Sequence, residues 1–234
     1  MSIEKKNARI AGLLYIISTF PMAFTELYVR SKLIVWEDAA ATANNIINSK
    51  SLYSIGFVCD VVGSTLFLLV PLALYKLLKH VNKEYATLMV ILALISVPMM
   101  AINMINHATV LELLRDVDYL NAFKPDQLHA LMMISLDAHG TGYLIAQIFF
   151  GLWLLPLGLL VYKSKVIPRI LGILLVAASV CYLIQFVTIF IFPNYGSIIN
   201  PIVNTVVGIA ELGLMFWLVI IGVKNRKVNL HDLN

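Results

Sequence analysis

The stretch from Ser135 to Ser164 reads SLDAHGTGYLIAQIFFGLWLLPLGLLVYKS and predicts how the chain folds. Its apolar run extends from Tyr143 to Tyr162 and ends at Lys163. About twenty apolar residues match the thickness of the hydrocarbon core of a bilayer. The stretch therefore predicts a membrane-spanning helix, with Asp137 and His139 at one mouth and a basic anchor at the other.

The composition of the whole chain agrees with this interpretation. Of the 234 residues, 60% are hydrophobic and only 13% are charged, and the mean hydropathy is +0.88. Soluble globular domains carry about 25% charged residues, so the composition excludes that class. The net charge of +4 comes from short Lys and Arg clusters between apolar runs, which indicates membrane topology and not nucleic-acid binding. We expect no nucleotide cofactor, and no pattern predicts an oligomeric state.

The apolar runs predict an all-α bundle of six membrane-spanning helices in a single integral membrane domain, residues 1–234. The predicted spans cover about residues 9–30, 52–76, 84–107, 140–163, 169–192 and 199–223. Pro125 and Asp126 mark the start of a helix ahead of the fourth span. Running on to Lys163, that helix would be about 57 Å long, more than a bilayer needs. We therefore expect a break or a projecting portion near residues 139–142.

Lys and Arg are distributed unevenly between the two ends of these spans. Twelve lie at one end: Lys5, Lys6, Arg9, Lys76, Lys79, Lys83, Lys163, Lys165, Arg169, Lys224, Arg226 and Lys227. Five lie at the other: Arg30, Lys32, Lys50, Arg115 and Lys124. The positive-inside rule then predicts that both termini are cytoplasmic. Between the first two spans, AAATANNII predicts a short extracytoplasmic helix on the membrane surface, capped by Glu37 or Asp38.

Ionisable residues occur within the predicted spans, where they are costly and usually face a cavity or a partner. Counting outward at 1.5 Å per residue places them in the outer half of the membrane or at its outer edge. We expect an outward-facing polar cavity lined by Glu26, Asp60, Asn103, His107, His139 and Glu211. Further cavity residues lie on the same helix faces or next to them: Asn106, Tyr143, Gln147 and Asn204.

The carboxylates in these spans lack basic partners there, apart from Arg30 one turn beyond Glu26. A buried carboxylate takes up a proton, meets a cation or faces water. One hypothesis is a divalent metal, zinc first and manganese or iron as alternatives, because carboxylates mixed with imidazoles suit these ions. The ligands would be Asp60, His107, His139 and Glu211, and the general base Glu26 or Asp137.

Geometry constrains this hypothesis at two places. Asp137 and His139 point about 200° apart on a straight helix, so both face one site only if the helix breaks there. Glu26 and Arg30 are also spaced to form a simple ion pair along one helix.

Three functions remain open on this basis. The first is a metal-dependent membrane enzyme of the hydrolase type, acting on a lipid or other amphiphile from the outer leaflet. The second is a binding or transport protein whose acids carry protons or bind a cationic solute. The third is a sensor or accessory subunit without catalysis, in which the polar residues fasten the helices together.

Several strings resemble a known family. They are ARIAGLLY at 8–15, RSKLIV and DAAATA within 30–43, Asp137-x-His139, FFGLWLLPLG at 149–158 and PRILG at 168–172. Together they resemble the bacterial membrane family called domain of unknown function 4386. The resemblance covers nearly the whole chain and implies a multi-pass protein of the bacterial cytoplasmic membrane. It supplies no catalytic residues, because the family carries no established activity.

Overall fold

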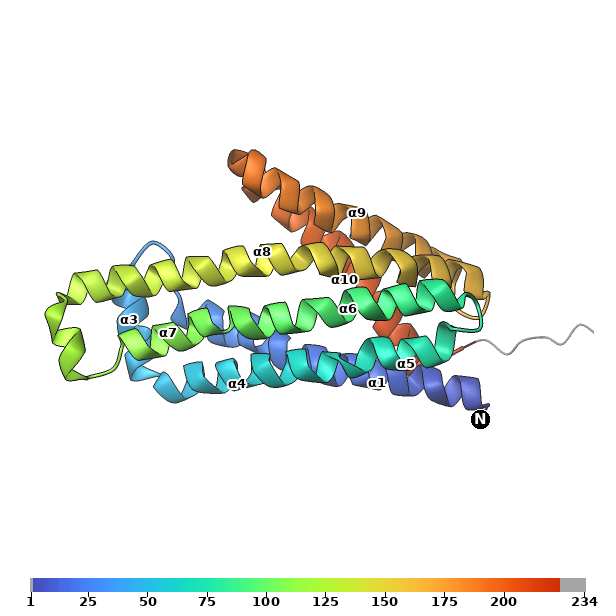
Figure 1. Cartoon of the computed structure of the whole chain (residues 1–234), viewed down its shortest axis with the longest axis horizontal. Coiled ribbons are helices and arrows are strands. Elements are labelled where there is room, and N and C mark those ends of the chain that lie inside the picture. The colour runs from blue at the N-terminus through green and yellow to red at the C-terminus, as the bar shows by residue number, and fades with distance from the viewer. Residues whose placement is uncertain (1, 224–234) are drawn as a thin grey trace, which may run out of the picture. The chain divides into compact units, whose positions relative to one another are not determined.

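A computed structural model describes residues 2–223 of the chain, and it is all-α (Figure 1). Six helices within these residues are long and apolar enough to cross a membrane. They are Ile3–Leu33, Lys50–Leu78, Lys83–Leu113, Pro125–Ser164, Arg169–Ile191 and Pro193–Ile220. Each predicted span overlaps one of them, so the prediction of six spans is confirmed. The predicted topology signals Lys224, Arg226 and Lys227 lie outside the described residues.

Local changes in the helical geometry divide four of these six helices into shorter elements. The elements in order are α1 (Ile3–Phe24), the π-helix η1 (Thr25–Arg30), α2 (Ser31–Leu33), α3 (Ala39–Asn48), α4 (Lys50–Phe67), α5 (Leu69–Leu78), α6 (Lys83–Asn103), α7 (Ile105–Leu113), η2 (Asp118–Ala122), α8 (Pro125–Ser164), α9 (Arg169–Ile191), η3 (Pro193–Tyr195) and α10 (Gly196–Ile220). Pro71 explains one break: it has no N–H to donate to the carbonyl of Phe67, where α4 ends.

The chain packs as two compact units, each built from segments far apart in the sequence. Unit 1 is formed by Met1–Tyr15, Leu69–Leu94 and Ile148–Asn234. Unit 2 is formed by Ile16–Leu68 and Ile95–Gln147.

Unit 2 has an apolar core at the turn between η1 and α3. Its buried members are Val29, Leu33, Ile34, Ala43, Ile46, Tyr53, Val110, Met132 and Leu136. The short helix α3 is therefore packed into the unit through Ala43 and Ile46. Asp38 caps it by accepting a hydrogen bond from the N–H of Ala41 at 2.8 Å. The predicted helix and one of its two predicted caps are confirmed.

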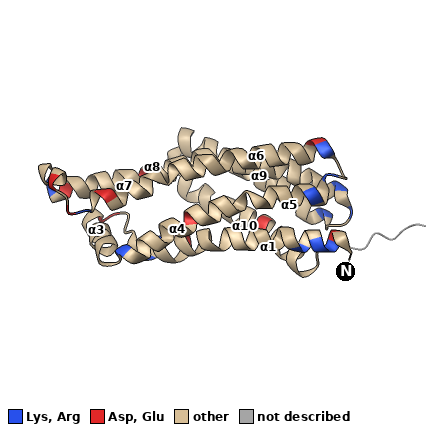
Figure 2. Ribbon diagram, turned by 60° about the horizontal axis from the view of Figure 1, so that its bottom comes forward, with Lys and Arg blue, Asp and Glu red and all other residues tan. Residues whose placement is uncertain are grey.

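Unit 1 brings several basic helix ends together. Lys163 at the end of α8 lies 4.9 Å above the ring of Tyr85 in the first turn of α6. Arg9 of α1 donates to the carbonyl of Ile220 at the end of α10, at 3.3 Å. Figure 2 shows Lys and Arg gathered at the start of α1 and at the turns that join α5 to α6 and α8 to α9.

Of the two alternatives expected near residues 139–142, the break is absent, and a portion that projects from the membrane stays a prediction. Helix α8 runs unbroken for 40 residues. A glycine in a helix costs about 1 kcal/mol relative to alanine, whereas an unpaired backbone group in an apolar environment costs several kcal/mol, so Gly140 and Gly142 stay helical. On this straight helix Asp137 is exposed and His139 is buried. The two side chains therefore do not share a site.

Candidate functional site

A π-helix places the central residue of the site. The segment η1 follows Pro21 and ends at Arg30. The hydroxyl of Thr25 lies 3.1 Å from the carbonyl of Pro21 and 3.0 Å from that of Gly56 on α4. A Cβ on Gly56 would lie 3.0 Å from Val29, so the glycine admits η1 close to α4. Single π-helical turns of this kind are frequent at functional sites.

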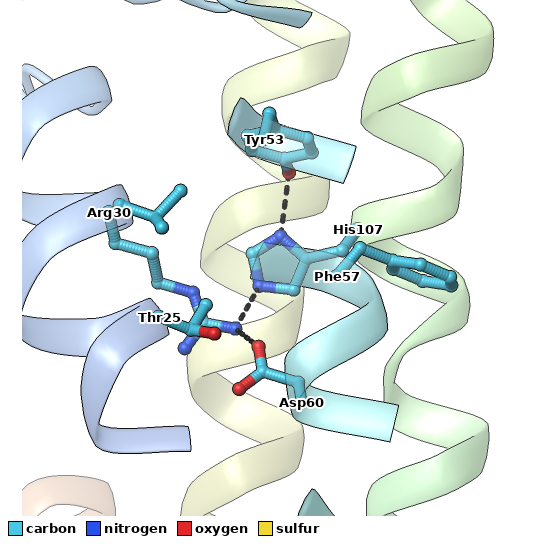
Figure 3. Close-up of a pocket in the computed structure, with 7 residues that line it drawn as sticks. Thr25, Arg30, Tyr53, Phe57, Asp60 and His107 are labelled. Atoms are coloured by element: carbon cyan, nitrogen blue, oxygen red, sulfur yellow. Dashed lines mark hydrogen bonds and ion pairs between the residues drawn. The ribbon is translucent and has the colours of Figure 1, made fainter. Parts of the chain in front are cut away.

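The guanidinium of Arg30 contacts two acids on different elements. Figure 3 shows its contact with Asp60. Its Nη2 donates to Oδ2 of Asp60 on α4 at 2.6 Å, and its Nη1 donates to Oε2 of Glu26 at 2.7 Å. The Asp60 side chain is 10% exposed and the Glu26 side chain 66% exposed. Arg30 therefore forms one buried ion pair between elements and one exposed pair within its own helix.

The contacts of His107 determine its tautomer. Its Nε2 lies 2.9 Å from Nη2 of Arg30, and its Nδ1 lies 2.6 Å from the hydroxyl of Tyr53. An arginine can only donate hydrogen bonds, so Nε2 accepts. The proton of the neutral ring then lies on Nδ1 and is donated to Tyr53. Both ring nitrogens of this buried histidine are thus occupied.

His139 extends the polar cluster to α8. Its ring centroid lies 4.1 Å from that of His107. Nδ2 of Asn103 donates to the carbonyl of His139 at 2.9 Å, and Nδ2 of Asn106 donates to Oδ1 of Asn103 at 3.0 Å. Gln147 is also buried, and its Oε1 has no hydrogen-bond partner within residues 2–223.

A small pocket opens beside these groups. Figure 3 shows it, lined by Thr25, Val29, Arg30, Tyr53, Phe57, Asp60 and His107. It has room for about one water molecule. Sites for drug-sized ligands have volumes of about 300–1,000 Å³. This arrangement therefore admits water or a proton but has no space for a lipid.

The sequence matches the family described as "Domain of unknown function (DUF4386)" over residues 10–222. The chain belongs to the DUF4386 family. The match includes all of unit 2, most of unit 1 and every residue of the cluster described above. No curated protein and no solved structure matches the chain. The family match and the six candidate spans establish a DUF4386 domain of multiple spans. The geometry of the site is the remaining source of evidence on its activity.

In this DUF4386 protein the predicted site residues are divided between the units. Unit 2 gathers Glu26, Asp60, Asn103, His107 and His139. Glu211 belongs to unit 1, where it accepts a short hydrogen bond from the hydroxyl of Tyr15. Tyr143 is 40% exposed, and Asn204 and Asp137 are exposed as well.

Two of the four predicted metal ligands, Asp60 and His107, are engaged by a cation. Within residues 2–223 no three His, Cys, Asp or Glu side chains form a group that could hold a metal ion. Arg30 contacts Oδ2 of Asp60 and Nε2 of His107, atoms that a metal would require. Metal binding by this DUF4386 protein stays a prediction, and it requires Arg30 to move away.

The contact of Arg30 with Asp60 and that of Tyr53 with His107 were not predicted from the sequence. The opposite charges of Arg30 and Asp60 were a signal in the sequence for the first of these two contacts. Arg30 and Asp60 are opposite charges toward the same predicted end of neighbouring spans, and an arginine side chain is long enough to reach between turns. No pattern in the sequence marked Tyr53.

Proposed function

We propose that this DUF4386 protein is a proton-binding membrane protein in which Asp60 takes up and releases a proton. One observation carries the proposal: Arg30 is shared by two acids, Asp60 at 2.6 Å on α4 and Glu26 at 2.7 Å on its own helix. An arginine with a second acid in reach keeps a counter-ion when the first acid becomes neutral. Acids and histidines at membrane depth commonly mark proton pathways.

Protonation of Asp60 would change how η1 is joined to α4. With Asp60 ionised, the buried ion pair connects the two elements, and breaking such a pair costs about 3–5 kcal/mol when one partner is removed. With Asp60 protonated, the Coulomb attraction is lost and Arg30 keeps Glu26. That exposed pair lies within one helix, so it does not join η1 to α4. The uptake of one proton therefore loosens one helix contact.

The pocket supplies the route for the proton. It has room for about one water molecule next to Asp60 and His107. A water there can pass a proton to the carboxylate of Asp60. A pocket of this size has no space for a lipid. Of the three functions considered from the sequence, the geometry favours transport of this kind over metal-dependent hydrolysis.

The orientation proposed for the chain has both termini in the cytoplasm and the pocket open to the outer face of the plasma membrane. The gathered basic ends of unit 1 support it, because basic residues are retained on the cytoplasmic side. In this orientation the helix α3 is extracytoplasmic. The proton and any small solute then enter unit 2 from the outer face.

Infrared difference spectroscopy during a pH titration tests the proposal on detergent-solubilised protein. Acidification should produce the carbonyl band of a protonated carboxylic acid that Asp60→Asn lacks. Asp137→Asn is the matched control, since it removes an exposed aspartate of α8, and it should retain the band. A wild-type spectrum that Asp60→Asn reproduces in full would overturn the proposal.

A further inference from the structure

A second acid, the half-buried Glu211, lies in unit 1 and is not used by the cluster around Arg30. It sits on α10 inside an apolar span. The hydroxyl of Tyr15 donates to its Oε2, and the side chain of Tyr182 also hydrogen-bonds to it. Tyr15 is 3% exposed and Tyr182 is 8% exposed. The acid is therefore held by two phenols from α1 and α9.

Aromatic packing fixes one of these phenols. Trp153 of α8 is 1% exposed and packs edge to face against Tyr15, with ring centroids 6.4 Å apart at an angle of 63°. Tyr15 thus has little freedom to turn away from Glu211. The packing of unit 1 therefore holds the hydroxyl of Tyr15 against Glu211.

Within residues 2–223, no cation forms an ion pair with Glu211. In the described part of the chain, the ion pairs involve Glu26, Asp60 and Glu112 but not Glu211. An isolated carboxylate in an apolar environment is costly, and it either meets a cation or binds a proton. Asp60 has Arg30, whereas the hydrogen-bond partners of Glu211 in the described part of the chain are two neutral phenols.

The chemistry of its partners suits an acid that gains and loses a proton. A phenol hydroxyl both donates and accepts hydrogen bonds, whereas a guanidinium only donates. Two phenols can donate to the carboxylate, and after protonation one of them can accept the hydrogen bond of the acid. Both forms of Glu211 are then hydrogen-bonded by the same two residues.

We infer that Glu211 is a second proton-binding group of this protein, held by Tyr15 and Tyr182 in both of its protonation states. The uptake step adds one proton to a carboxylate oxygen and turns one phenol from donor to acceptor. No metal, redox partner or covalent step is needed. The inference does not depend on Asp60, because all of these residues lie in unit 1.

The test uses infrared difference spectra of the full chain across a pH titration. Glu211→Gln keeps the size of the side chain and should remove one carboxylic-acid band. Tyr15→Phe should shift that band, because the acid loses one hydrogen bond. Gly208→Ala is the control: it lies one turn away on α10 with no atom within 4 Å of a Cβ, and the band should be unchanged.

This experiment tests proton binding by Asp60 and by Glu211 independently. Asp60→Asn should leave the Glu211 band in place, and Glu211→Gln should leave the Asp60 band in place. If Glu211→Gln does not fold, the band shift in Tyr15→Phe reports on the same group. A spectrum with no band that responds to either Glu211→Gln or Tyr15→Phe would overturn the inference.

Discussion

The side chain of Asn103 occupies the space that a side chain at Gly142 would need. A Cβ built on Gly142 would lie 2.1 Å from Oδ1 of Asn103. From this position Asn103 donates to the carbonyl of His139 at 2.9 Å. The glycine therefore allows α6 to reach the backbone of α8 beside the histidine pair.

The first prediction concerns this contact. Gly142→Ala should lower the free energy of unfolding by about 1–3 kcal/mol, the usual cost of overpacking. Gly140→Ala is the matched control two residues away, where a Cβ meets nothing within 4 Å, and it should be neutral or stabilise by up to about 1 kcal/mol. Equilibrium unfolding in detergent micelles measures both. Equal effects of the two substitutions would contradict the packing described here.

The second prediction compares two arginines with similar ion pairs. Arg30→Gln leaves the buried Asp60 without its cation and should cost about 3–5 kcal/mol of unfolding free energy. Arg115→Gln breaks an exposed pair with Glu112, which is 2.7 Å long against 2.6 Å for the buried pair, and should change stability little. Unfolding curves of the two variants under the same conditions measure both changes in the free energy of unfolding. If the Arg30 variant were as stable as the Arg115 variant, the buried pair would not contribute to the stability of the fold.

Much of the fold follows from simple physical constraints on the sequence. An apolar run long enough to cross a bilayer has to be helical, so six such runs predict six helices. Asp38 before AAATANNII predicts the cap of α3 because its carboxylate can satisfy a free N–H of the first turn. These features depend on neighbouring residues in the chain, which a sequence displays directly.

The site was predicted less well because it depends on contacts between distant segments. Helical spacing places Asn103 and His107 on one face, but it does not show that Arg30 reaches Asp60 from another helix. Gly140 and Gly142 suggested a break in α8, whereas the structure uses Gly142 for close approach. Composition alone does not distinguish these two uses of glycine.

The third prediction tests the proposed orientation. In a variant without Cys59 and Cys181, a single cysteine at Asp118, in η2 after α7, should react with a membrane-impermeant maleimide on intact cells. A single cysteine at Lys165, in the turn after α8, should react only after the cells are permeabilised. The reverse labelling pattern would place the basic helix ends outside.

The fourth prediction addresses the metal hypothesis. Elemental analysis of protein purified without chelator should find well below one zinc, manganese or iron per chain, because Arg30 occupies Asp60 and His107. Arg30→Gln frees these donors, and its metal content should be equal or higher. About one metal ion per wild-type chain, lost in Asp60→Asn, would instead favour the metal-dependent enzyme.

The most direct test of the proton-binding account is the coupling energy between Arg30 and Asp60 as a function of pH. A cycle of Arg30→Gln, Asp60→Asn and the double variant isolates this energy, which for contacting residues is about 0.5–3 kcal/mol. The attraction requires an ionised carboxylate, so the coupling should be largest at high pH and disappear as the pH falls and Asp60 takes up a proton. A coupling energy that stays constant wherever the protein remains folded would contradict the account.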